Sequence, residues 1–216
     1  MSRPYDAAKR VLDVLAATVG LLLATPVIAA VAFAVLITMG RPVLFRQARP
    51  GRHGQLFELV KFRSMTVGGE GGAPANDGAR LTRFGRWLRT TSLDELPQLW
   101  NVLRGEMSLV GPRPLLPAYL TRYTPEQFRR HDVRPGITGL QQVYGRNSLS
   151  WEERFALDVR YVRQRSLGLD LRILLRTVRT VLLREGITAS GAATAHEYLG
   201  PSELAGAGAG PAEARR

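Results

Sequence analysis

Two adjacent carboxylates, Asp94 and Glu95, are the residues of this sequence best suited to chemistry. They come just before a short apolar stretch bounded by proline and glycine, which predicts a helix over residues 97–104. The positive end of a helix favours ionised carboxylates, as a metal ligand or a carboxylate nucleophile requires. Acids before helices also serve as ordinary caps, and Ser92 with Glu95 fits a capping box. The pair alone therefore supports both a catalytic and a structural interpretation.

The charge of the chain favours anionic partners. The 216 residues include 30 Lys and Arg against 18 Asp and Glu, for a formal net charge of +12, and nearly all of the positive charge is arginine. The planar guanidinium binds phosphate through two parallel hydrogen bonds, so the predicted partners are nucleic acid, anionic lipid headgroups or phosphorylated small molecules. The chain has no cysteine and three scattered histidines. Disulfides and thiolate chemistry are excluded, and a hard cation with oxygen ligands remains possible.

A long apolar segment near the N-terminus must place this chemistry at a membrane. From Val14 to Met39 there is no charged side chain, and roughly 20 apolar residues suffice to cross a bilayer as a helix. Hydropathy alone favours a single transmembrane helix, but basic residues flank both ends, which assigns both ends to the cytoplasm. Thr25-Pro26 lies near the middle, where proline kinks a helix and a threonine hydroxyl can satisfy the freed backbone. Residues 1–40 therefore predict a re-entrant membrane helix–break–helix.

The rest of the chain predicts a mainly helical α+β domain over residues 41–187, followed by an Ala/Gly-rich disordered tail over 188–216. Runs 42–47 and 56–62 are β-prone and predict a small hairpin. Residues 67–79 predict a flexible glycine-rich loop. Helical patterns follow in four stretches: 80–90, 115–131, 151–166 and 169–184.

The stretch 80–90 combines an apolar stripe with arginines at every third position. Such basic amphipathic helices lie in the membrane interface, although an ordinary helix docked on the core shows the same pattern. With the apolar segment before it, we favour amphipathic interface helices.

Three function classes fit these features. An acid pair, arginines at rigid turns and a membrane segment suit phosphoryl transfer at a bilayer surface. A membrane-tethered basic module that binds nucleic acid or anionic lipid without catalysis is the alternative, but the sequence contains no recognisable nucleic-acid-binding motif. A structural module at the membrane interface is the third possibility.

Six motifs in one order, from about Tyr5 to Ile187, resemble the bacterial sugar transferases known as monotopic phosphoglycosyl transferases. The motifs are Lys9-Arg10 with Asp13, Phe45-Arg46-Gln47 with Arg49 and Gly51, Lys61-Phe62-Arg63-Ser64-Met65, Thr91-Ser92-Leu93-Asp94-Glu95-Leu96-Pro97-Gln98, Ser108-Leu109-Val110-Gly111-Pro112-Arg113-Pro114 and Arg134-Pro135-Gly136-Ile137-Thr138-Gly139. Two positions depart from the family pattern. Thr25-Pro26 stands where relatives commonly have Ser-Pro, and Leu140-Gln141-Gln142 replaces a common Trp-Ala-Gln.

The resemblance implies an activity, a cofactor and partners. Such enzymes move a sugar-1-phosphate from a UDP-sugar to polyprenol (undecaprenyl) phosphate at the cytoplasmic face of the bacterial cell membrane, release UMP and require Mg²⁺. By this resemblance Asp94 is the nucleophile that forms a covalent phospho-sugar intermediate. Glu95, together with Asp94, is implied to bind the metal ion. The substrate-binding residues that it implies are Lys61, Arg63, Arg89, Pro112, Arg113 and Pro114.

Overall fold

The computed structural model describes residues 4–66, 80–145, 149–183 and 197–201. The glycine-rich stretch 67–79 and most of the tail predicted to be disordered lie outside the described residues. The α-helices are α1 (Pro4–Met39), α3 (Arg83–Thr91), α4 (Gln98–Arg104), α5 (Pro125–Phe128), α6 (Leu140–Tyr144), α7 (Trp151–Gln164) and α8 (Leu167–Leu183). The strands are β1 (Leu44–Pro50), β2 (Leu56–Phe62), β3 (Ser108–Val110) and β4 (Gly136–Thr138). Short 3-10 helices are η1 (Arg52–Gly54), η3 (Leu93–Glu95), η4 (Pro117–Tyr119) and η5 (Arg129–Asp132).

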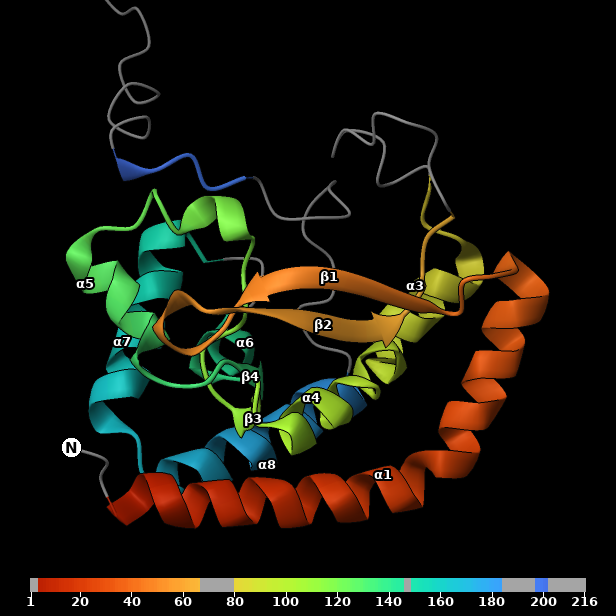
Figure 1. The fold of residues 1–216 in the computed structure, drawn as a ribbon, viewed down its shortest axis with the longest axis horizontal. Helices are drawn as coiled ribbons and strands as arrows, with labels where there is room; N and C mark the ends of the chain where they lie inside the picture. The colour runs from red at the N-terminus through yellow and green to blue at the C-terminus, as the bar shows by residue number, and fades with distance from the viewer. Residues whose placement is uncertain (1–3, 67–79, 146–148, 184–196, 202–216) are drawn as a thin grey trace, which may run out of the picture.

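The apolar N-terminal segment forms one helix, α1, with Pro26 inside it. Figure 1 shows that α1 bends sharply, so that its first arm runs beside α4 and its second arm returns toward α3. The hydroxyl of Thr25 donates a hydrogen bond of 2.8 Å to the carbonyl of Leu21, and threonine back-bonding together with a proline bends helices. The two helices predicted here are therefore two arms of a single bent helix. The re-entrant topology stays a prediction.

Much of the surface of α1 consists of exposed apolar side chains. It is the one helix in the described part of the chain that is long and apolar enough to cross a membrane. Leu22 and Leu23 are 70% and 75% exposed on the protein surface. Because apolar patches of this extent mark membrane or protein contacts, α1 accounts for the membrane association of the chain.

The hairpin has the predicted location, since β1 and β2 pair antiparallel from Leu44 opposite Phe62 to Pro50 opposite Leu56. The second arm of α1 packs on it and on α3, where Val31 and Val35 join Phe62 and Leu88 in one buried cluster. Leu88 and Phe84 belong to the apolar stripe expected in the membrane interface. Both residues contact the second arm of α1, which the bend brings over α3, and a location of α3 in the membrane interface stays a prediction.

The centre of the chain is less helical than its pattern predicted. Residues 115–131 form η4, α5 and part of η5, and α5 begins after Thr124 with a capping box. Two strands that the sequence did not indicate, β3 and β4, pair in parallel. The predicted helices over 151–166 and 169–184 are confirmed as α7 and α8.

Candidate active site

The acid pair lies on η3, between the end of α3 and the start of α4. Ser92 ends α3 with a left-handed backbone (φ 57°), and its side chain makes no capping hydrogen bond to η3. The capping-box interpretation of Ser92 and Glu95 is therefore wrong for this chain. The predicted helix over 97–104 is confirmed as α4, with Pro97 at its N-cap and Gly105 in the left-handed conformation at its C-cap.

Asp94 is buried, with 5% of its surface exposed. Its 3-10 turn packs against β2 and α3. Burial and the neighbouring charge of Glu95 raise the pKa of Asp94 to about 6, against the opposing effect of Lys61, Arg89 and Arg113. The basic groups hold the carboxyl mainly ionised at neutral pH although it lies in the protein interior. An ionised carboxylate is one of the groups that can form a covalent intermediate in phosphoryl transfer.

Lys61 comes to this site from β2. It pairs with Phe45 on β1, and its Nζ lies 5.3 Å from the centre of the Phe45 ring. Burial lowers the pKa of Lys61 and the charge of Asp94 opposes that effect. The ammonium group is thus directed toward the acid pair by a strand whose register is set by the hairpin.

Asn101 of α4 holds β2 in place. Its side chain accepts a hydrogen bond of 3.1 Å from the backbone N–H of Val60 and donates one of 2.7 Å to the carbonyl of Glu58. The side-chain amide thereby forms the backbone hydrogen bonds that a neighbouring strand would otherwise form at this edge of β2. It connects the strand that carries Lys61 to the helix that follows Asp94.

Arg89 approaches from the last turn of α3. Its Nε donates a hydrogen bond of 2.9 Å to the hydroxyl of Ser64, which follows β2. This approach requires glycine at position 85, because a Cβ there would lie 1.7 Å from the carbonyl oxygen of Ser64. Arg89 is therefore held close enough to Asp94 to affect its pKa.

Arg113 projects from a rigid loop. The N–H of Gly111 donates to the carbonyl of Thr138 at 2.9 Å, and Gly136 donates to that of Pro112 at 3.0 Å. Gly111 has no room for a side chain, since a Cβ would lie 2.5 Å from the carbonyl of Arg134. The Arg113 side chain is 47% exposed, and its Nη2 lies 3.0 Å from Oε1 of Glu95. The charge of Glu95 raises the pKa of Arg113, and the guanidinium remains accessible to an anionic ligand.

The other three residues predicted to bind substrate stabilise the fold around the site. Pro112 and Pro114 are buried on either side of Arg113 and stiffen its loop. Arg63 is buried, and its two terminal nitrogens donate to the carbonyls of Met39, Gly40 and Arg41. With these donors engaged, Arg63 caps the C-terminal end of α1. Substrate contacts by these three residues remain predictions.

The carboxylates fit a cation that is shared with a substrate. No group of three or more Asp, Glu, His or Cys lies together in the part of the chain that the structure describes. Asp94 and Glu95 would therefore supply two carboxylates, which is the usual protein contribution where Mg²⁺ also binds substrate phosphates.

Two further groups at this site were missed as site residues by sequence reasoning. Arg49 was noted only as part of a motif, yet burial and the charge of Arg113 lower its pKa to about 10. Arg130 and Asp158 form a buried ion pair, with Nη2 and Oδ2 2.6 Å apart. The same Nη2 donates to the carbonyl of Arg113 at 2.7 Å. Residues that are far apart in sequence carry no local signal for such a contact.

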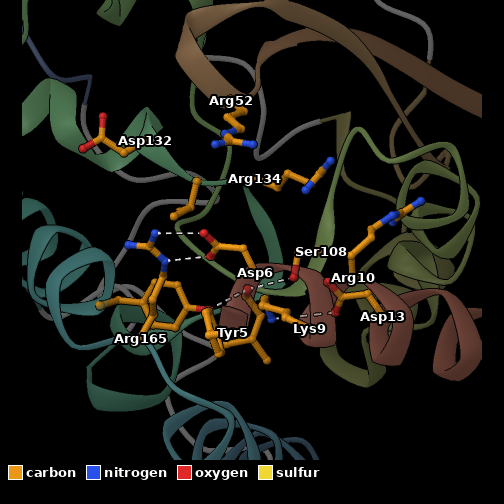
Figure 2. A pocket seen from close by; sticks show the side chains of 13 residues that line it. Tyr5, Asp6, Lys9, Arg10, Asp13, Arg52, Ser108, Asp132, Arg134 and Arg165 are labelled. Carbon is orange, nitrogen blue, oxygen red and sulfur yellow. Dashed lines mark hydrogen bonds and ion pairs between the residues drawn. The ribbon is translucent and has the colours of Figure 1, made fainter. Parts of the chain in front are cut away.

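A polar junction joins the first arm of α1 to this domain. Figure 2 shows side chains that line a cavity here, with Arg165 paired with Asp6 and Lys9 with Asp13. The cavity volume is about 40 Å³. Asp13 also accepts a hydrogen bond of 3.1 Å from the N–H of Leu109 in β3. Lys9 and Asp13 lie one turn apart on α1 and form an ion pair at 3.7 Å. The hydrogen bond of Asp13 with Leu109 joins α1 to the domain.

Two basic residues that precede the apolar segment, Lys9 and Arg10, also make contacts here. Lys9 donates to Asp170 of α8 at 2.7 Å. Arg10 donates to the carbonyls of Val102 and Leu103 at 2.6 and 2.9 Å, at the end of α4. These contacts fix the direction in which α1 leaves the domain.

Comparison with known proteins identifies the family of this chain. The family described as bacterial sugar transferase matches residues 4–184. The chain is 51% identical to an uncharacterized sugar transferase, EpsL of Bacillus subtilis, over 91% of this chain and 98% of that protein. It is 45% identical to the UDP-glucose:undecaprenyl-phosphate glucose-1-phosphate transferase of Caulobacter vibrioides, over 82% of this chain and 70% of that protein.

A third relative is longer. The chain is 39% identical to the undecaprenyl-phosphate galactose phosphotransferase of Salmonella typhimurium and spans 41% of its length. The matched region contains the acid pair, the loop of Arg113 and the bent helix. The chain therefore belongs to the bacterial sugar transferase family, and it is an enzyme of the transferase class.

Proposed function

We propose that this enzyme transfers a sugar-1-phosphate from a UDP-sugar to undecaprenyl phosphate and releases UMP. The observation that carries the proposal is the buried Asp94 carboxylate, surrounded by Lys61, Arg89 and Arg113 and followed by Glu95. Phosphoryl transfer requires positioning and neutralisation of phosphate charge, and three fixed cations beside one nucleophile supply both. The names of the Caulobacter and Salmonella relatives support undecaprenyl phosphate as the acceptor.

The first step uses Asp94 as nucleophile. An oxygen of its carboxylate attacks the sugar-proximal phosphorus of the UDP-sugar, an O–P bond forms, and the bond to the UMP oxygen breaks. UMP leaves with the bonding electron pair as a phosphate anion. Lys61, Arg89 and Arg113 neutralise the charge that develops on the phosphate oxygens. The exposed guanidinium of Arg113 is available to accompany the nucleotide phosphate.

The second step transfers the sugar-1-phosphate to the lipid. An anionic phosphate oxygen of the polyprenol phosphate attacks the same phosphorus, and the bond to Asp94 breaks. The carboxylate is regenerated and a polyprenol diphosphate sugar is the product. Two steps allow the soluble nucleotide to leave before the lipid acceptor enters the same site.

Mg²⁺ would be held by Glu95, with Asp94 and the phosphates of the donor completing its ligands. When bound, the cation supplies charge neutralisation at the diphosphate. The ion pair of Glu95 with Arg113 orients both side chains toward the same substrate region.

The proposed location is the cytoplasmic face of the bacterial membrane, with α1 re-entrant. The bend of α1 supports this topology, because it returns the second arm to the domain that the first arm leaves. Helix α8 adds a second apolar surface, with exposed Leu171, Leu175 and Val178. An enzyme held in this way has its active site close to the headgroup of its lipid acceptor.

Release of UMP from a panel of UDP-sugars tests the proposal. Membranes that carry the protein, with undecaprenyl phosphate and Mg²⁺, are expected to release UMP with at least one sugar. Asp94→Asn is expected to be inactive, and Glu95→Gln to lose roughly a hundredfold or more in rate, as for removal of a single electrostatic contact in other active sites. Glu58→Gln, a change on the exposed face of the hairpin, is the matched control and keeps full activity.

The covalent intermediate is tested without acceptor. A donor labelled in the sugar is expected to label the wild-type chain at Asp94 and to leave Asp94→Asn unlabelled. Full activity in Asp94→Asn would contradict the covalent mechanism. Tight, salt-dependent binding of nucleic acid, unaffected by changes at Asp94 and without UMP release, would support the non-catalytic alternative instead.

A further inference from the structure

The segment Glu197–Pro201 is docked on the domain although it lies in the tail that composition predicted to be disordered. Tyr198 is 1% exposed. Its ring centre lies 4.9 Å from that of Phe155 and 5.7 Å from that of Tyr119. Figure 1 shows the segment in blue beside α5 and α7. The family match ends at residue 184, so Tyr198 lies outside the matched residues while Phe155 and Tyr119 lie inside them.

Hydrogen bonds fix the orientation of Tyr198. Its backbone N–H donates to the hydroxyl of Tyr119 at 3.2 Å. Its own hydroxyl lies 3.0 Å from Oε1 of Gln127 and 3.2 Å from the carbonyl of Arg122. Arg122 also pairs with Glu197 at 2.8 Å. Packing and polar contacts together make the segment part of the domain.

Two of the rings around Tyr198 also enclose Arg130. The guanidinium carbon of Arg130 lies 5.6 Å from the ring centres of both Tyr123 and Phe155. The Tyr123 hydroxyl accepts a hydrogen bond of 3.0 Å from Nη1 of Arg130. Tyr123 stacks on Tyr198 with ring centres 6.1 Å apart. Tyr198 therefore closes the aromatic wall against which Arg130 is packed.

Arg130 connects this aromatic cluster to the active site through its contact with Arg113. It is 2% exposed, its charge is balanced by Asp158, and its Nη2 donates to the carbonyl of Arg113. Close-packed interiors transmit displacement rather than absorb it. A buried charged group has little freedom to move without losing its hydrogen bonds, which makes this contact a stiff one.

We propose that Tyr198 is a positioning residue for Arg113, acting through Tyr123, Phe155 and Arg130. The effect on substrate rests on the proposed function, in which Arg113 contacts the phosphates of a uridine nucleotide. The effect on the Arg113 loop does not, because it follows from the contacts alone. Loss of the Tyr198 ring loosens Arg130, and the loop of Arg113 then samples positions in which its guanidinium meets the diphosphate less well.

Hydrogen exchange of the full-length, detergent-solubilised protein tests the structural part without any ligand. Tyr198→Ala is expected to accelerate amide exchange in residues 111–116, with β2 and α3 unchanged. Tyr198→Phe keeps the ring and is expected to restore the wild-type pattern, and Leu199→Ala is the matched control because Leu199 is 50% exposed. Wild-type exchange at 111–116 in Tyr198→Ala, or acceleration spread evenly over the chain, would overturn the proposal.

Binding of UDP in the presence of Mg²⁺ tests the link to substrate. Tyr198→Ala is expected to raise the dissociation constant on the order of tenfold, and to add no further loss in an Arg113→Ala background, as for residues that act through one contact. Equal losses in both backgrounds would contradict action through Arg113. Failure of the wild-type protein to bind UDP would count against the proposed function, while hydrogen exchange would still decide the positioning role.

Discussion

At the scale of single residues, Asp94 combines two properties that oppose each other. Its burial makes the carboxylate reactive and also makes its ionised form costly. Lys61, Arg89 and Arg113 offset part of this cost, and the balance leaves a pKa of about 6. The residue is therefore destabilising in the form that the proposed chemistry needs.

This balance predicts that Asp94→Asn is inactive but more stable at neutral pH. The pKa of Asp94 is 3.8 in the unfolded reference and about 6 in the folded protein, so the folded state binds the proton more tightly. Stability from this group is present below pH 4 and is lost as pH rises through 6. Asp94→Asn is expected to gain on the order of 1 to 3 kcal/mol at pH 7.5 and about a third of that gain at pH 4.5, which lies between the two pKa values. Denaturant unfolding at both pH values measures this gain in unfolding free energy, with Glu58→Gln as control. An equal gain at the two pH values would contradict the raised pKa of Asp94.

At the scale of elements, the site is assembled from pieces that could not hold it individually. The acid pair lies on a three-residue 3-10 helix, Lys61 on a two-stranded hairpin and Arg113 on a loop. Such short elements are stable only through their tertiary contacts. Asn101 is the main polar contact between β2 and α4, and it is 1% exposed.

Asn101→Ala is expected to loosen the hairpin from α4. The change leaves the N–H of Val60 and the carbonyl of Glu58 without their side-chain partner. Unpaired buried groups cost about 1 to 3 kcal/mol each, so a loss of about 2 to 4 kcal/mol in unfolding free energy is expected. Arg104→Gln, which removes an exposed ion pair on the same helix, is the control and is expected to cost under about 1 kcal/mol. Similar losses in the two variants would show that Asn101 does not brace β2.

At the scale of the whole molecule, α1 determines how the domain meets the membrane. Its first arm is fixed by the ion pair of Lys9 with Asp170 and by the hydrogen bond from the N–H of Leu109 to Asp13, and its C-terminal end by Arg63. Both ends of the helix are thus bound to one domain. A straight membrane-crossing helix would separate these ends by the thickness of the bilayer.

Cysteine labelling tests this topology, and the absence of native cysteine makes it direct. In intact cells, Ala7→Cys and Phe45→Cys are both expected to be protected from a membrane-impermeant thiol reagent and to react after the membrane is opened. Val27→Cys, close to Pro26 on the exposed apolar surface, is expected to react poorly in both conditions. Labelling of positions 7 and 45 from opposite sides of the membrane would exclude the re-entrant arrangement.

The sequence by itself determined the acid pair, the apolar segment with its proline, the hairpin, α4 and the two long C-terminal helices. These features depend on local signals, namely adjacent charges, hydropathy, turn residues and periodicity. The family resemblance also came from the sequence, because its motifs are contiguous in the chain.

The tertiary structure alone decided which residues meet. Only folding shows that Arg63 caps α1, that the stripe of α3 faces α1, and that Tyr198 packs on the aromatic rings around Arg130. These contacts join residues far apart in the chain, and nothing in the local pattern of either partner encodes the other. The same holds for Asp94, whose raised pKa arises from a desolvated environment that exists only when η3, β2 and α3 are packed together.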